Sequence, residues 1–219
     1  MDLVALVLPS LLEASLVTLR VTLQAGLLAL VVSLVVGVLR EVRNPLVAVP
    51  VRIYVEFFRG TSAFVQIYWV YFALPLIGVR LPPIEAGVIV LGLNVGAYGS
   101  EVVRGALEAI PRAQREACIA LNLPPWTTFS RILLPQAMLR VVLPFGNLLI
   151  DLLKGTALLS AISVTELAFA GRQAASAFGQ PLIIFSLVLV LYLCMAAPLA
   201  WAARAIDARV RRAIPVGMA

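Results

Sequence analysis

The sequence predicts an all-α polytopic membrane protein with about five transmembrane helices. Of the 219 residues, 62% are hydrophobic and only 13% are charged, whereas a soluble domain is about half apolar and about a quarter charged. So few charges cannot cover a water-soluble surface, and the high apolar content also excludes intrinsic disorder. The sequence contains no histidine, so the side chain that most often serves as general base or metal ligand is missing.

Five windows with few or no charges determine the predicted number of crossings, because about 20 helical residues span a hydrocarbon core roughly 30 Å thick. The windows are Val21–Leu39, Thr61–Val79, Ala86–Ser100, Ile132–Ile150 and Leu182–Ala203. We expect the fourth to form one helix over residues 135–158, followed by an outer loop with room for a short helix. Residues 3–12 are too few to cross, so an N-terminal interfacial helix is expected there.

The basic residues are distributed unequally between the two sides of the predicted spans, which predicts the orientation. Only Arg80 and Arg172 lie on the outer side. The side with the excess of basic residues is the cytoplasmic one. The opposite, cytoplasmic side holds most of the 17 Lys and Arg residues: Arg40, Arg43, Arg52, Arg59, Arg104, Arg112, Arg115, Arg131, Arg140, Arg204, Arg209, Arg211 and Arg212. Five crossings then place the N-terminus outside and the C-terminus in the cytoplasm, with one membrane domain over residues 1–219.

The longest predicted cytoplasmic segment, residues 104–135, is expected to form two short helices with a sharp turn between them. Pro111 opens the first helix and Pro124-Pro125 opens the second, because proline is favoured where the first N–H of a helix has no partner. Asn122 lies between them and tolerates the left-handed conformation that ends helices. Such a projection suits contact with a partner, although a solvated connection without special function fits the same composition.

The spacing within this segment resembles the EAA loop of the membrane subunits of bacterial ABC importers. Glu116-Ala117-Cys118, three residues, Asn122, nine residues and Ile132-x-Leu134-Pro135 follow the register of E-A-A, three residues, G, nine residues and I-x-L-P. Cys118 replaces an alanine and should pack similarly, since it is small and soft. Asn122 replaces the glycine and keeps access to positive φ.

Neighbouring blocks resemble the polar amino acid (His/Gln/Arg-type) permease branch of this family. They are Tyr54-Val55-Glu56-x-Phe58-Arg59-Gly60-Thr61, Glu101-x-x-Arg104-Gly105 and Leu134-Pro135-Gln136-Ala137. Ser62 departs from the proline that this branch commonly has after Arg-Gly-Thr. Within the branch, residues 59–63, 120–122 and 144–147 look like permeases for ectoine and hydroxyectoine. The resemblance covers residues 16–205, with the coupling loop at residues 109–135.

The resemblance implies a type I ABC importer transmembrane fold in a multi-pass protein of the bacterial inner membrane. An extracytoplasmic solute-binding protein delivers the solute, and a cytoplasmic ABC ATPase dimer, which binds ATP and Mg, drives transport. A second permease subunit completes the path, with a heterodimer expected and a homodimer as the alternative. The chain has no G-x-x-x-x-G-K-[ST] sequence for phosphate binding. We therefore expect no catalytic residues, cofactor or metal in this chain. The lipid bilayer is a further expected partner, and no nucleic acid is expected to bind.

The resemblance also assigns the ATPase-coupling contact to residues of the coupling loop. They are Glu116, Ala117, Cys118, Asn122 and Leu123.

Two polar stripes on neighbouring spans are candidates for the substrate path. Asn147 and Asp151 share one helix face with Lys154, and Asn94 and Tyr98 share another with Glu101. Ionisable groups inside a span face the bundle interior or a watery cavity, whereas polar side chains also bind helices together. We expect the path to include Asn94, Tyr98, Asn147, Asp151 and Gln66, and expect structural or gating roles for Lys154, Glu101, Arg104 and Arg59.

Two other classes of function remain open from the sequence. A secondary transporter or channel subunit would work without an ATPase, but five spans are few for one and no internal repeat is evident. A non-transporting scaffold or intramembrane enzyme is the other class, and the missing histidine argues against the enzyme.

Overall fold

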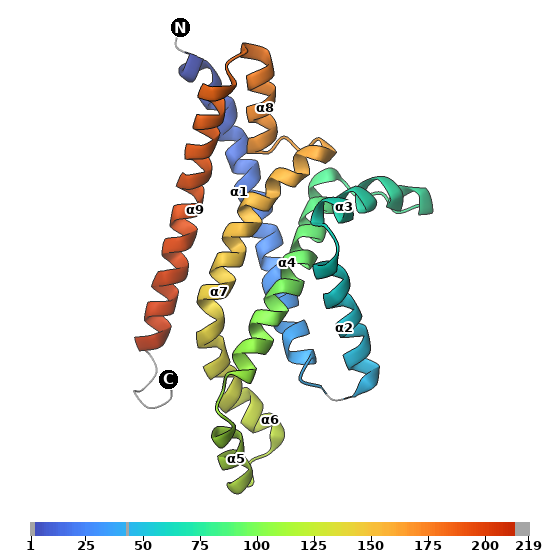
Figure 1. Ribbon diagram of the computed structural model, residues 1–219, viewed down its shortest axis with the longest axis vertical. Helices are drawn as coiled ribbons and strands as arrows, with labels where there is room; N and C mark the ends of the chain where they lie inside the picture. The colour runs from blue at the N-terminus through green and yellow to red at the C-terminus, as the bar shows by residue number, and fades with distance from the viewer. Residues whose placement is uncertain (1–2, 43, 213–219) are drawn as a thin grey trace.

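The computed structural model describes residues 3–42 and 44–212, and the regular structure of these residues is all helical. Long helices run side by side along the length of the molecule (Figure 1): α1 (Leu3–Leu39), α4 (Pro83–Glu108), α7 (Leu134–Gly155) and α9 (Pro181–Arg212). Four segments are long and apolar enough to cross a membrane, and a bent helix pair makes up to five. The predicted all-α polytopic architecture is therefore confirmed.

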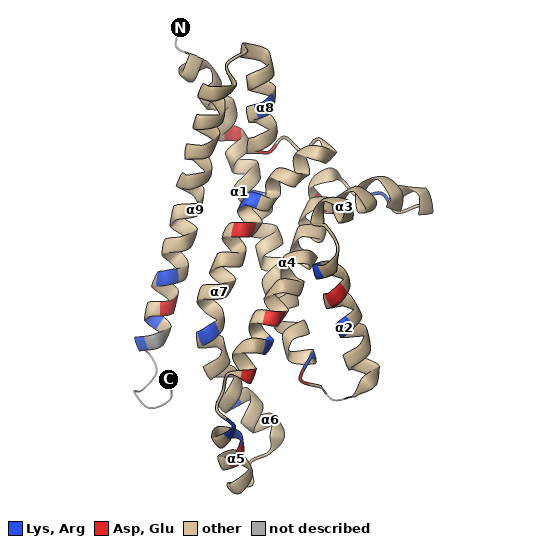
Figure 2. Cartoon of the chain, in the orientation of Figure 1, with Lys and Arg blue, Asp and Glu red and all other residues tan. Residues whose placement is uncertain are grey.

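Charged side chains gather toward one end of the bundle. Figure 2 shows most Lys, Arg, Asp and Glu residues in the half of the molecule that carries α5 (Arg112–Ala120) and α6 (Pro125–Thr127). This is the half that the count of basic residues assigns to the cytoplasm. Arg43, which belongs to that count, and the terminal residues 1–2 and 213–219 lie outside the described residues.

The prediction of a separate N-terminal interfacial helix is wrong, because α1 continues without a break from Leu3 to Leu39. Val7 and Leu11 are buried in a cluster with Leu167 and Ile184. These partners belong to α8 (Leu167–Phe178) and α9. The first turns of α1 thus bury apolar surface by packing against other helices of the bundle.

The second predicted span, Thr61–Val79, is also corrected, because a bent pair of helices replaces it. α2 (Pro45–Gly60) meets the segment Ala63–Ile77 at a bend of 105°. That segment begins with α3 (Ala63–Tyr68) and ends in the short turns η1 (Trp69–Ala73) and η2 (Leu74–Ile77), and it points away from the bundle in Figure 1. The apolar windows left α2 outside the predicted spans, in a segment whose Arg52 and Arg59 were counted on the cytoplasmic side.

Glycines on α4 allow it to lie directly against α1. A Cβ atom at Gly96 would lie 2.7 Å from Val32 Cγ1, and one at Gly99 would lie 2.0 Å from Ser33 Oγ. The Ser33 hydroxyl donates across the contact to the carbonyl oxygen of Gly96 at 3.2 Å. Close approach through small residues drives helix association where lipid removes the hydrophobic advantage. Gly92 belongs to the same contact, since a Cβ atom there would lie 2.7 Å from Leu28 Cδ2.

Replacing Gly99 with alanine is expected to destabilise the protein. The added Cβ would overlap Ser33, and overpacking of this kind costs about 1–3 kcal/mol. Gly105→Ala on the same helix is the matched control, because nothing lies within 4 Å of its added Cβ and alanine favours the helix by about 1 kcal/mol. Thermal unfolding in detergent should rank Gly105→Ala at or above the native protein and Gly99→Ala below it. Equal melting temperatures for the two variants would contradict this account of the α1–α4 contact.

Candidate functional site

The segment between α4 and α7 forms two short helices that project beyond the long helices (Figure 1). Pro111 precedes α5, and Pro124 precedes α6, as the sequence predicted. α6 passes through the π-helical turn η3 (Thr128–Leu133) into α7, so the second arm of the projection is continuous with a long helix. The coupling loop, defined as residues 109–135, is therefore a helical hairpin.

The turn of this hairpin is a Schellman motif, which ends a helix through a left-handed residue. Asn122 has φ of 51°, and its N–H donates to the carbonyl of Ile119 at 2.8 Å. The N–H of Leu123 donates to the carbonyl of Cys118 at 3.0 Å. Asn122 thus adopts the left-handed conformation expected of the residue that replaces the glycine of the EAA register.

Large apolar side chains are exposed around the turn. Ile119, Leu121 and Trp126 are 77%, 71% and 74% exposed. Of the residues assigned to ATPase coupling, Glu116, Ala117 and Asn122 are exposed, Leu123 is half-buried and Cys118 is buried. Cys118 therefore supports the hairpin from inside. These exposed apolar groups make the tip of the hairpin a candidate surface for a protein contact.

Two arginines, Arg115 and Arg140, connect the coupling loop to the ends of α1, α4 and α7. Arg115 donates to the carbonyl of Leu107 at the end of α4, at 3.2 Å, and pairs with Glu41 just after α1, at 3.5 Å. Arg140 of α7 donates to the carbonyl of Ala109 at 2.8 Å. The loop cannot shift far without moving the ends of these helices.

The polar stripe on α4 binds the end of α2 at its bend. Asn94 donates to the carbonyl of Phe58 at 2.9 Å and to Gln66 Oε1 at 3.1 Å. Gln66 donates to the hydroxyl of Thr61 at 2.6 Å and, from the same nitrogen, to the carbonyl of Phe58 at 3.1 Å. The last carbonyls of a helix lack partners, and an unsatisfied one is costly in lipid. The contacts of Asn94 and Gln66 therefore match the alternative in which polar side chains bind helices together.

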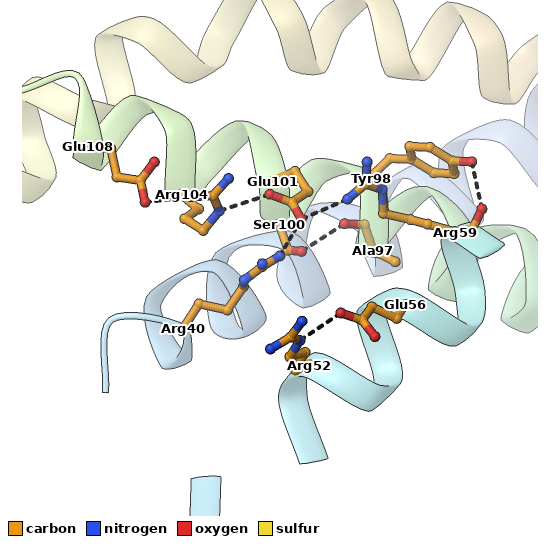
Figure 3. Close-up of polar contacts among 10 residues, drawn as sticks. All are labelled: Arg40, Arg52, Glu56, Arg59, Ala97, Tyr98, Ser100, Glu101, Arg104 and Glu108. Atoms are coloured by element: carbon orange, nitrogen blue, oxygen red, sulfur yellow. Dashed lines mark hydrogen bonds and ion pairs between the residues drawn. The ribbon is translucent and has the colours of Figure 1, made fainter. Parts of the chain in front are cut away.

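One turn further along α4, Tyr98 and Glu101 continue this contact with α2. The Tyr98 hydroxyl donates to the carbonyl of Arg59 at 3.4 Å. The Arg59 guanidinium lies over the Tyr98 ring, 5.4 Å from its centroid, and also reaches Glu101 (Figure 3). Tyr98 and the Arg59 side chain are both partly exposed, at 39% and 41%.

Glu101 is the centre of a charged cluster that joins three helices (Figure 3). Its Oε1 accepts from Arg40 at 2.5 Å and from Arg59 at 2.7 Å, and its Oε2 accepts from Arg104 at 2.9 Å. Arg104 also pairs with Glu108. The Glu101–Arg104 pair follows from the sequence, but Arg40 does not, because 61 residues separate it from Glu101.

The second predicted stripe lies on an open face of α7. Asn147 is exposed, and Asp151 and Lys154 pair at 3.1 Å with their side chains 68% and 64% exposed. The structure does not bring the two stripes together, since one binds α2 and the other faces outward from the chain.

Glu166 is a fully buried carboxylate that sequence reasoning missed. It precedes α8 and accepts from the N–H groups of Ala168 and Phe169 at 2.9 and 2.7 Å, and from the Tyr192 hydroxyl of α9 at 3.1 Å. Burial raises the pKa of Glu166, against the lowering effect of these hydrogen bonds and of Arg172. Its position directly before an apolar helix was the available signal.

Comparison with known proteins shows the family of the chain. The family described as "Binding-protein-dependent transport system inner membrane component" matches residues 29–212. The chain belongs to this family. It is thus the multi-pass inner-membrane component of a transport system whose other parts include a binding protein and an ATPase, and it is neither the enzyme nor the carrier of a cofactor.

Two curated relatives cover most of the chain. The probable amino-acid ABC transporter permease protein y4tF of Sinorhizobium fredii is 40% identical over 176 residues, which are 78% of this chain and 74% of the relative. The glutamine transport system permease protein GlnP of Escherichia coli is 36% identical over 161 residues, 73% of this chain and 74% of the relative.

Solved structures share the fold. The chain superposes on an amino acid ABC transporter crystallised with histidines with a TM-score of 0.87 at 23% identity, covering 95% of this chain and 99% of the other. An inward-facing structure of the MetNI methionine ABC transporter gives 0.79 at 25% identity, covering 92% and 96%.

The stability of the protein is expected to depend on pH through Glu166. Its pKa in the folded state is raised above the ordinary value of 4.5, so the folded state binds this proton more tightly than the unfolded state does. The contribution to stability is full below pH 4.5 and is lost as the pH rises through the folded pKa. Thermal unfolding of the native protein and of Glu166→Gln between pH 4 and 8 should show a flatter profile for the variant. Parallel profiles would refute the assignment to Glu166.

Proposed function

We propose that the chain is the permease subunit of an ATP-driven importer for a polar amino acid or an amino-acid-derived solute. The coupling loop would seat on the ATPase dimer through Glu116, Ala117, Asn122 and Leu123, with Cys118 packed beneath. The observation that carries this proposal is the exposed apolar tip of a fastened helical hairpin that has the register of the EAA motif.

Movement of the ATPase would pass into the membrane through this hairpin. The Schellman turn fixes its tip, and Arg115 and Arg140 bind its base to α1, α4 and α7. A nucleotide-dependent ATPase that binds one position of the hairpin more tightly would bias the helices between two arrangements, as linkage requires.

The open face of α7 supports a second permease subunit and a path beside it. A charged pair exposed to lipid is costly, so such residues face protein or water. Asn147, Asp151 and Lys154 lie on this face, so a partner subunit that covers it would enclose a polar path. Tyr98 would reach the path from α4, whereas Asn94 and Gln66 would act by holding the bend of α2 and α3. A heterodimer is the favoured assembly and a homodimer the alternative, with the N-terminus outside and the C-terminus in the cytoplasm.

The names of the relatives, which refer to amino acids and to glutamine, support an amino acid as the solute. Ectoine or hydroxyectoine is the narrower proposal, and it rests on residues 59–63, 120–122 and 144–147. Calorimetry of the cognate binding protein with glutamine, arginine, histidine and ectoine would decide between them.

The double variant Leu121→Ala/Trp126→Ala is expected to lose the ATPase. Both side chains are largely exposed, so the fold should persist, while truncation of interface hot spots costs about 2 kcal/mol or more each. ATPase that co-purifies with the permease in detergent should fall at least about tenfold. Leu76→Ala, which truncates a residue 85% exposed elsewhere, is the matched control. Full ATPase retention would refute the assignment of the contact to this tip, and uptake without any ATPase would overturn the proposal in favour of a secondary transporter or channel.

Asn147→Ala is expected to weaken uptake without weakening the fold. Loss of one hydrogen bond to a charged solute costs about 1.5–3 kcal/mol, so uptake into proteoliposomes at limiting solute should fall roughly tenfold or more. Ser186→Ala, at an exposed polar position of α9, should leave uptake unchanged. Equal uptake by the two variants would show that Asn147 does not line the path.

A further inference from the structure

We propose that Glu101 is a positioning residue that passes movement of the coupling loop to the bend between α2 and α3. This inference rests on the proposed function, since it assigns a route to the coupling. Its basis is that the Glu101 carboxylate joins α4, which leads into the coupling loop, to the last turn of α2, which ends at the bend.

The route begins in the last turns of α4. α4 runs without a break from Pro83 to Glu108, so Glu101 and the residues at the base of the loop belong to one rigid element. Arg115 binds the carbonyl of Leu107, and Ile110 is buried in the same cluster as Leu107. A displacement of the loop therefore displaces the segment of α4 that carries Glu101.

The route continues across two helix contacts. Arg59 in the last turn of α2 and Arg40 directly after α1 both donate to Oε1 of Glu101, whereas Arg104 of α4 itself donates to Oε2. Oε1 thus accepts hydrogen bonds from segments outside α4, and Oε2 accepts one from α4 itself. The carboxylate is 22% exposed, so solvent screens these contacts less than it screens a surface pair.

The route ends at the bend. The last turn of α2 is bound by α4 at two further points, since Asn94 binds the carbonyl of Phe58 and Tyr98 binds that of Arg59. Gln66 of α3 binds the carbonyl of Phe58 as well. Movement of α4 is therefore transmitted both to the end of α2 and to the start of α3.

The charge balance of the cluster explains why Glu101 is the sensitive position. Three guanidinium groups surround it, and Glu108 pairs with Arg104. Loss of the Glu101 charge leaves the guanidinium groups of Arg40 and Arg59 close together without a counter-charge, so the charged link of both segments to α4 would weaken. Loss of the Arg59 side chain alone keeps the Arg40 and Arg104 contacts and removes only the charged link between Glu101 and α2.

Two variants test this in the complete transporter, reconstituted in proteoliposomes with its ATPase and binding protein. Glu101→Gln and Arg59→Met should each lower the solute taken up per ATP hydrolysed by at least about fivefold, in the range of allosteric couplings. The amount of bound ATPase should stay as in the native complex, because the coupling surface is untouched.

Arg52→Met is the matched control that separates coupling from loss of charge. It removes a basic residue of α2 whose partner, Glu56, lies on the same helix, so it should keep the native ratio of uptake to ATP hydrolysis.

Native ratios in Glu101→Gln and Arg59→Met would overturn the inference, as would equal losses in Arg59→Met and Arg52→Met. If Glu101→Gln fails to assemble, Arg59→Met decides alone. A native complex without ATP-dependent uptake would instead refute the proposed function.

Discussion

The arrangement of this protein depends on the need to satisfy the backbone carbonyls where a helix breaks inside the bundle. Helix ends leave carbonyls without partners, and lipid offers them no water. The bend between α2 and α3 is possible because α4 supplies Asn94 and Tyr98 to the last turn of α2, and α3 returns Gln66 to the same place. The position of α2 is therefore determined by one face of α4.

The same helix connects the long-helix bundle with the projecting coupling loop. Glycines on one face of α4 allow close contact with α1, its polar face holds α2, and its end carries the coupling loop. One unbroken helix thus carries small residues toward α1, polar residues toward α2, and charged residues in its last turns. The proposed route from the coupling loop to the bend of α2 and α3 depends on this arrangement.

Much of the coupling loop could be predicted from the sequence because its geometry is local. The prolines before α5 and α6 and the left-handed Asn122 act on their immediate neighbours, so their spacing determines the hairpin. The charge-free windows likewise predicted four of the long helices, because hydropathy over about 20 residues is enough to identify a span.

The features that the sequence did not predict depend on contacts between distant residues. The meeting of Arg40 with Glu101 spans 61 positions, and the burial of Val7 and Leu11 depends on α8 and α9. The charges of α2 indicated a segment outside the spans, because the pairing of Arg59 with Glu101 on α4 could not be known. The polar stripe of α4 was identified correctly by its spacing, but periodicity states which residues share a face and not what that face touches.

The exposed Asp151–Lys154 pair on α7 has a consequence for assembly. A solitary copy in a bilayer would draw water and lipid headgroups toward this pair, thinning the membrane around it. The second permease subunit proposed above would remove this distortion by covering the pair, so the cost of membrane thinning would favour its association with this face of α7.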